Sequence, residues 1–401
     1  MKTRRLLYGI YIISIFILLC KDSFAYFTWN WDYYPGYKQL LLYGSFSLIA
    51  FVYKRTNKIR IKITGSLLGA IAFFLLGTLI PTYSIGGLML YVVRSYPLLI
   101  LLSDEDNTVK NLRIITELMG LLLIPGIIVW VANLKLQLPA PIIQHPNESD
   151  NYLFFNYIVN IGLINDSRFG FIRFQSVFLE PGYLGVLLSF LLYANKYRIK
   201  RWYNMVCLIG LLFSFSLAGY IITGVGVILS SSTSNKTVVG SFIVSSFLVI
   251  VFVLMGRSIN NGDNIINNVI LSRISGANVV EDNNRFGGNI DYVFNQSFSN
   301  GKILFGDPSQ LEISGDGAGY KVFLIIHGII GTLFSFLLYL CLLVYNKQTK
   351  YGYGFLFIIC ITFLQASYPY SCSWLIPYIL GLTNNGVRPT ADKRLKYADS
   401  I

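Results

Sequence analysis

Long runs of apolar residues, separated by short polar stretches, recur along almost the whole chain. A run of about 20 apolar residues can cross a bilayer as a helix. The pattern predicts about twelve membrane-spanning helices, at residues 6–20, 39–53, 64–80, 85–102, 114–132, 176–194, 203–218, 219–231, 238–255, 321–345, 353–368 and 372–384. The fold class is therefore predicted to be all-α, with residues 1–401 forming a single integral membrane domain.

Composition strengthens this prediction and removes other classes. Of the 401 residues, 54% are hydrophobic and only 13% are charged, whereas a soluble domain carries about 25% charged residues. Disordered, collagen-like and disulfide-stapled proteins are excluded. The five cysteines lie in or beside apolar runs, and there are only two histidines. The sequence thus contains no metal-ligand spacing, and neither a metal nor a cofactor is expected.

The net charge of +13 is explained by membrane orientation rather than by nucleic acid. If the N-terminus is cytoplasmic, most Lys and Arg residues fall in the inner loops and tails, at residues 2–5, 54–62, 110–113, 196–201, 236, 347–350 and 388–396. An excess of Lys and Arg on the cytoplasmic side is the usual signature of topology. The same orientation leaves two long outer loops, at about 133–175 and 256–320, and loops of this size are often functional.

The first outer loop ends in a charged stretch. Arg168 and Arg173 precede Glu180, which enters the next apolar run at Pro181-Gly182. Arginine suits phosphate oxygens because its planar fork donates two hydrogen bonds at once. Glu180 has two interpretations: a general base for a hydroxyl, or a salt-bridge partner that orders Arg173.

The second outer loop carries further candidates. Arg273 and Arg285 are possible phosphate or sugar ligands, and Asp316 precedes the next apolar run. His327 lies inside that run, where a lone histidine is more often a hydrogen-bonded core residue than a catalytic one.

Other charged residues need separate explanations. Arg94 lies within an apolar run, so it must either line a polar cavity or meet a partner, for which Glu117 is a candidate. Asp104-Glu105-Asp106 is interpreted as a solvated turn, and Asp32 as part of an interfacial aromatic belt.

The order of these motifs resembles the bacterial O-antigen polymerases, which are related to O-antigen ligases and exopolysaccharide polymerases. The resemblance depends on Arg173 with Glu180-Pro181-Gly182, on Asn284-Arg285 followed by Phe305-Gly306, and on Asp316-Gly317 followed by Gly328-Ile329-Ile330-Gly331. The number of apolar runs and the two outer loops match as well. Ligases often carry a His-Asn pair where this chain has Asp316-Gly317, which favours a polymerase over a ligase.

The resemblance implies a fold like that of the type C glycosyltransferases, in the bacterial inner membrane, with two large periplasmic loops and a site facing the periplasm. The implied partners are the lipid bilayer and undecaprenyl-diphosphate-linked oligosaccharide and polysaccharide, without nucleic acid. A chain-length regulator protein stays open as a further partner. Arg168, Arg173 and Arg285, with Arg273, would bind the diphosphate, and Glu180 or Asp316 would deprotonate the acceptor.

Two alternatives remain. A ligase would share the fold and the chemistry but use another acceptor. A flippase for the same lipid-linked units would not be an enzyme, and its charges would be spread through a central cavity, whereas here they concentrate in two outer loops.

Overall fold

The computed structural model describes residues 2–82, 85–136, 138–146, 153–164, 172–230, 289–310, 319–346 and 350–383. The structure is mostly helical. The α-helices are α1 (Lys2–Asp22), α2 (Gly36–Asn57), α3 (Gly65–Thr82), α4 (Ile85–Ser103), α5 (Thr108–Leu136), α6 (Pro181–Ala194), α7 (Trp202–Phe213), α8 (Leu217–Ser230), α11 (Asn289–Ser299), α13 (Gly319–Tyr345), α14 (Lys350–Gln365) and α15 (Cys372–Thr383).

The helical fold class predicted from the sequence is confirmed. Within the described ranges, four helical stretches are long and apolar enough to cross a membrane, and they correspond to α1, α4, α5 and α13. Shorter apolar helices pack against them, and α15 contacts three of the four. These apolar helices indicate a membrane protein. The predicted run 238–255 lies outside the described residues.

Several helix boundaries differ from the prediction, and two of the differences have a local cause. The helix expected from residue 176 begins at Pro181, and Glu180 before it is extended (φ −141°, ψ 151°). Proline lacks an N–H and suits the first helical position, while the residue before it avoids helical angles. The adjoining predicted runs 203–218 and 219–231 are divided at residues 214–216 rather than at 218/219, and Phe215 there has a φ of 46°.

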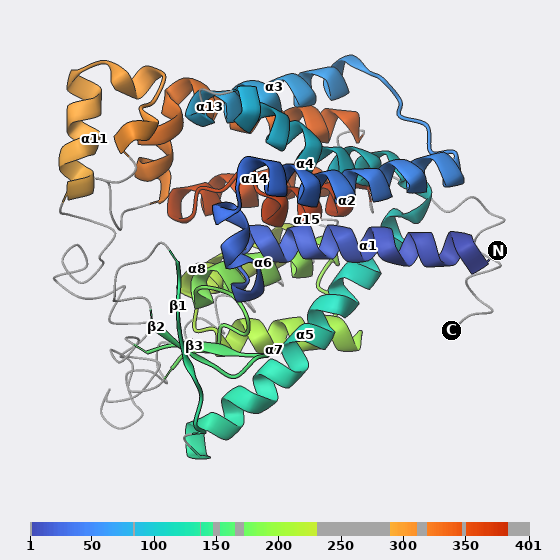
Figure 1. Ribbon diagram of the computed structural model, residues 1–401, viewed down its shortest axis with the longest axis vertical. Helices are drawn as coiled ribbons and strands as arrows, with labels where there is room; N and C mark the ends of the chain where they lie inside the picture. Colours follow the sequence, from blue (N-terminus) through green and yellow to red (C-terminus); the bar gives the residue numbers. More distant parts are fainter. Residues whose placement is uncertain are drawn as a thin grey trace.

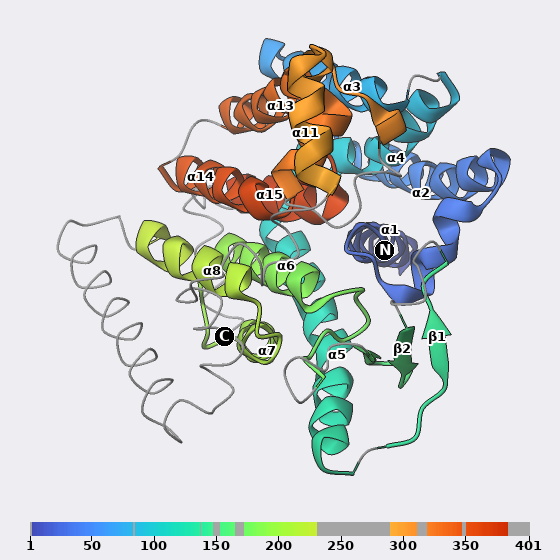
Figure 2. The same ribbon diagram turned by 90° about the vertical axis from the view of Figure 1, so that its left-hand side faces the viewer.

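Most helices pack side by side along one main direction, while α5 runs obliquely to them (Figure 1). The closest neighbours are α13 with α3, α2 with α4, α6 with α8 and α5 with α7, while α1 touches α2, α5 and α15. Figure 2 looks along α1 and shows α11 lying across α13. Ile290 and Val293 of α11 are buried there together with Ile325 of α13.

One end of the bundle, which we call the sheet end, carries a small antiparallel sheet (Figure 1). Its strands are β1 (Ile142–Gln144), β2 (Leu153–Asn156) and β3 (Ile161–Leu163), in the order β1-β2-β3. Ile143 is opposite Phe154, and Phe155 is opposite Gly162. The predicted loop 133–175 therefore contains strands that the apolar pattern did not indicate. Four 3-10 turns complete the described elements: η1 (Tyr26–Tyr33), η2 (Glu105–Asn107), η6 (Lys302–Leu304) and η7 (Pro308–Gln310).

The opposite end is held by a buried polar network. Tyr53 and Asn111 hydrogen-bond to Asp104 Oδ2 at 2.8 and 3.4 Å, and Asn107 hydrogen-bonds to Asp104 Oδ1 at 2.9 Å. Asp104 is 3% exposed, so interpreting it as part of a solvated turn is wrong. Its donors come from three separate elements, which lock α2 to α5 at this end of the bundle.

Candidate functional site

The structure locates part of the predicted site. Glu180 and Arg173 belong to the described residues and are both half-buried. The other predicted site residues lie outside the described residues; they are Arg168, Arg273, Arg285 and Asp316. The site is therefore built below from the segment that contains Arg173 and Glu180, and from the elements that contact it.

The segment from Arg173 to Glu180 is fixed to the bundle at both ends. Near Arg173, Trp130 Nε1 donates to the Ile172 carbonyl at 2.7 Å, and Phe174 N donates to the Phe213 carbonyl at 3.2 Å. These bonds attach the start of the segment to α5 and to the end of α7. Arg173 therefore has a defined backbone position at the sheet end rather than a free loop position.

The other end of the segment pairs with the chain that leaves α1. Tyr26 N donates to Val177 O at 2.8 Å, and Leu179 N donates to Phe24 O at 3.1 Å. Together with an antiparallel bridge between Ala25 and Phe178, these bonds hold the end of α1 beside the start of α6. Glu180 directly follows Leu179, whose N–H is bonded to the chain two residues after Asp22.

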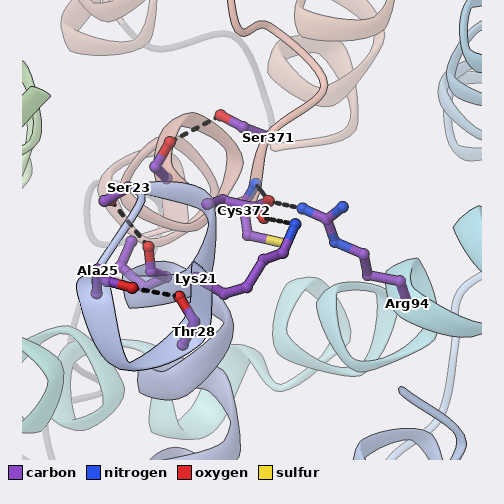
Figure 3. Close-up of polar contacts among 10 residues, drawn as sticks. Lys21, Ser23, Ala25, Thr28, Arg94, Ser371 and Cys372 are labelled. Carbon is purple, nitrogen blue, oxygen red and sulfur yellow. Dashed lines mark hydrogen bonds and ion pairs between the residues drawn. The ribbon is translucent and has the colours of Figure 1, made fainter. Parts of the chain in front are cut away.

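A buried ion cluster lies at the end of α1 (Figure 3). The Asp22 carboxylate, whose side chain is 2% exposed, forms an ion pair with Arg94 of α4. It also accepts a hydrogen bond from the Cys372 N–H at the start of α15, at 2.5 Å. Lys21 Nζ lies 3.7 Å from Asp22 Oδ1. Three helices thus meet at one carboxylate.

This cluster corrects the predicted partner of Arg94. Arg94 does have a partner, as expected for a charge inside an apolar helix, but Glu117 is the wrong one. Glu117 instead pairs with Arg113 one helical turn earlier, at 2.7 Å. Lys21 and Arg94 together carry two positive charges against the single negative charge of Asp22. The three side chains therefore gather two cations and one carboxylate at the end of α1.

A small cavity adjoins the cluster. Its volume is about 10 Å³, which is room for about one water molecule. Nine residues line it: Asp22, Ser23, Tyr183, Val186, Leu187, Ala366, Tyr368, Ser373 and Trp374. Charged, hydroxyl and aromatic groups from α1, α6 and α15 therefore face one space at the sheet end.

Aromatic rings form part of the lining of this cavity. The Tyr183 and Tyr368 hydroxyls are 2.7 Å apart, and the Phe24 ring lies 4.9 and 5.6 Å from these two rings. Tyr183 lies three residues after Glu180, in the first turn of α6. Aromatic faces beside hydroxyl groups suit sugar rings, which bind by stacking and by hydrogen bonds.

The Phe305-Gly306 motif of the predicted second outer loop contacts the Gly328 motif of α13. Gly328 interrupts α13 with a φ of 68°, and Gly306 has a φ of 82°. A Cβ on Gly306 would lie 2.2 Å from the Ile326 carbonyl oxygen, and one on Gly328 would lie 2.5 Å from Gly306 N. The two backbones therefore cross at a distance that only glycine permits.

His327 has a structural explanation. His327 Nδ1 is 3.1 Å from the Gly77 carbonyl oxygen, and its ring stacks on Phe323 at 4.0 Å. This arrangement is that of a hydrogen-bonded core histidine. Asp32 lies in η1. Within the described residues, no group of three His, Cys, Asp or Glu side chains is placed to bind a metal ion.

Sequence reasoning missed Asp22, Lys21, Tyr183 and Tyr368. The available signal was the Lys21-Asp22 pair directly after an apolar run, together with an arginine inside another run. Comparisons of the chain with protein-family models, with curated proteins and with solved structures found no match. The function is therefore argued from the residues at the sheet end.

Proposed function

We propose that this chain is an O-antigen polymerase, a glycosyltransferase that joins a polysaccharide on undecaprenyl diphosphate to a new lipid-linked repeat unit. The first support is the sequence resemblance, in which three motifs occur in the family's order. Two segments of that resemblance, Phe305-Gly306 and Gly328–Gly331, are packed against each other. Their contact explains why glycine is needed in both.

The observation that carries the proposal is the chemistry gathered at the sheet end. The Glu180 carboxylate directly before α6, the Lys21–Asp22–Arg94 ion cluster and the Tyr183–Tyr368 pair all lie at this end. A lipid diphosphate donor needs cations for its leaving group, and its sugars need aromatic and hydroxyl groups. Apolar helices run from this end along the bundle and suit the lipid part of the substrate.

In the proposed reaction, an acceptor hydroxyl attacks the anomeric carbon of the donor polysaccharide. The new C–O bond forms as the bond to the diphosphate breaks, and undecaprenyl diphosphate leaves. Glu180 or Asp316 takes the hydroxyl proton. Arg168, Arg173, Arg285 and Arg273 stabilise the negative charge that develops on the diphosphate.

The proposed setting is the bacterial inner membrane, crossed about twelve times by a fold of the type C glycosyltransferase kind. The sheet end faces the periplasm, because the opposite end carries the Lys- and Arg-rich loops around residues 54–62 and 196–201. Lipid-linked units are therefore met on the periplasmic side.

A deletion strain tests this proposal. We expect its lipopolysaccharide to carry a single repeat unit, and the wild-type gene to restore long chains. Loss of every unit from the core, with long lipid-linked polymer retained, would indicate a ligase instead. Unpolymerised units trapped on the cytoplasmic face would indicate a flippase.

Complementation with variants then tests the residues. Arg173→Ala and Glu180→Gln are expected to abolish the polysaccharide ladder at normal protein levels. Arg55→Gln is the matched control, because Arg55 is an exposed residue at the end of α2 away from the sheet. Normal ladders from both site variants would refute the assigned roles.

A further inference from the structure

The connection between α2 and α3 has an unusual alternating pattern. Residues 58–63 read Lys-Ile-Arg-Ile-Lys-Ile, and residues 59–64 form neither helix nor strand. The connection lies at the end of the bundle away from the sheet (Figure 1), where its three isoleucines and Arg60 line one groove.

The isoleucines form one wall of an open groove of about 590 Å³. Its lining is Lys54, Ile59, Arg60, Ile61, Ile63, Leu67, Leu68, Ile71 and Leu99, from α2, the connection, α3 and α4. Ile63 is 74% exposed and Leu68 is 56% exposed. The groove is therefore an accessible apolar surface rather than a closed core cavity.

The charged groups of this groove are all positive. Lys54 and Arg60 line it, and no acidic residue does. Among the residues that the structure describes, neither Lys54 nor Arg60 forms an ion pair. By contrast, Lys62 points to Glu105, with Nζ 2.8 Å from Oε1, and this hydrogen bond raises the pKa of Lys62. Two uncompensated cations are thus fixed at the edge of an apolar groove.

We propose that this groove binds an anionic diacyl phospholipid, with the phosphate at Lys54 and Arg60 and an acyl chain along Ile63, Leu68 and Ile71. The cations attract the phosphate, and guanidinium can donate two hydrogen bonds to it. The long side chains of Lys and Arg keep their charges at the headgroup level while their stems cover apolar surface. The binding is independent of the reaction proposed above.

Charge and shape together select this occupant. A small soluble anion would use the two cations but would leave Ile63 and Leu68 exposed to water. A zwitterionic lipid would cover these residues, but its headgroup would gain less from two unpaired positive charges. Only an amphiphile with a net negative headgroup uses both halves of the groove.

Native mass spectrometry of the full-length protein in detergent tests the proposal, with dioleoyl phosphatidylglycerol and dioleoyl phosphatidylcholine as probes. One cation near the headgroup is expected to contribute about fivefold in affinity, and the pair about 30-fold. Wild type should therefore prefer phosphatidylglycerol by about that factor. The Lys54→Gln/Arg60→Gln variant should bind the two lipids equally.

Three further variants separate the contributions. Arg55→Gln and Lys62→Gln remove nearby cations that do not line the groove, and they should retain the preference within about twofold. Leu68→Asn should weaken binding of both lipids, because it acts on the acyl chain. The charge-keeping swap Lys54→Arg/Arg60→Lys should retain the preference, and it keeps the test informative if the neutral variant fails to fold.

Several results would overturn the proposal. Equal binding of the two lipids by wild type would do so, as would the same loss of preference in Lys62→Gln as in the groove variant. Competition by soluble glycerol phosphate at the lipid's own concentration would show that the acyl chain does not matter. Gel filtration of each variant establishes that it is folded.

Discussion

The Asp22–Arg94 pair offers the sharpest test of how the sheet end is built. Replacing Asp22 with Asn keeps the shape and still allows the side chain to accept from Cys372 N, but it leaves Arg94 without its charge partner. Arg94→Gln removes the positive charge instead, and it leaves the Asp22 carboxylate, whose side chain is 2% exposed, without its main ion-pair partner. The Lys21 ammonium, 3.7 Å away, then compensates only in part.

Removing one partner of a buried ion pair costs about 3–5 kcal/mol. The remaining contacts of Asp22 place each single variant at the lower end, at about 3 kcal/mol. The double variant should cost little more than either single one, because the second change removes the charge that the first left unpaired. The coupling energy is therefore expected to be about 2 kcal/mol or more.

The assay is the free energy of unfolding by denaturant in detergent, for wild type, both single variants and the double variant. Glu117→Gln is the matched control. It breaks an ion pair within one helix whose Arg113 side chain is 61% exposed, so it should cost only about 0.3–0.5 kcal/mol. Additive losses in the double variant, or an equal loss in Glu117→Gln, would refute the pairing.

Further stability predictions use the same measurement. Gly328→Ala should cost about 3 kcal/mol, because it adds a Cβ against a crossing backbone at positive φ; Gly301→Ala, also at positive φ but in open space, should cost about 1 kcal/mol. A similar loss in both variants would contradict the close crossing. Tyr53→Phe removes a hydrogen bond to the buried Asp104 carboxylate and should cost about 2 kcal/mol. Tyr368→Phe loses an exposed hydroxyl contact and should cost less than about 1 kcal/mol. A larger loss in Tyr368→Phe than in Tyr53→Phe would be evidence against the network around Asp104.

The positions of the helices could be predicted because an apolar run in a membrane protein has few alternatives to a helix. The predicted runs at 39–53 and 85–102 lie inside α2 and α4. The sheet could not be predicted in this way, since β1 and β3 have only three residues each. An alternating pattern needs a longer stretch to be distinguished from chance.

The candidate site was predictable only in part, because pairing is decided by tertiary contacts. The position of Arg94 in an apolar run demanded either a polar cavity or a partner, and nothing in the sequence distinguishes Asp22 from Glu117 as that partner. Asp104 seemed solvated because it is flanked by polar residues, whereas donors from α2 and α5 converge on it. Glu180 could be singled out because its Pro-Gly neighbours mark the start of a helix.

The most direct test of the proposed function is a reaction with purified components. The protein is reconstituted in proteoliposomes with undecaprenyl-diphosphate-linked repeat units, and the length of the glycan and the released undecaprenyl diphosphate are measured. We predict one undecaprenyl diphosphate released for each new glycosidic bond, with the rate lowered at least about 100-fold by Glu180→Gln and unchanged by Arg55→Gln. Folded protein that forms no polymer would contradict the account, and a Glu180→Gln variant as active as wild type would exclude Glu180 as the base.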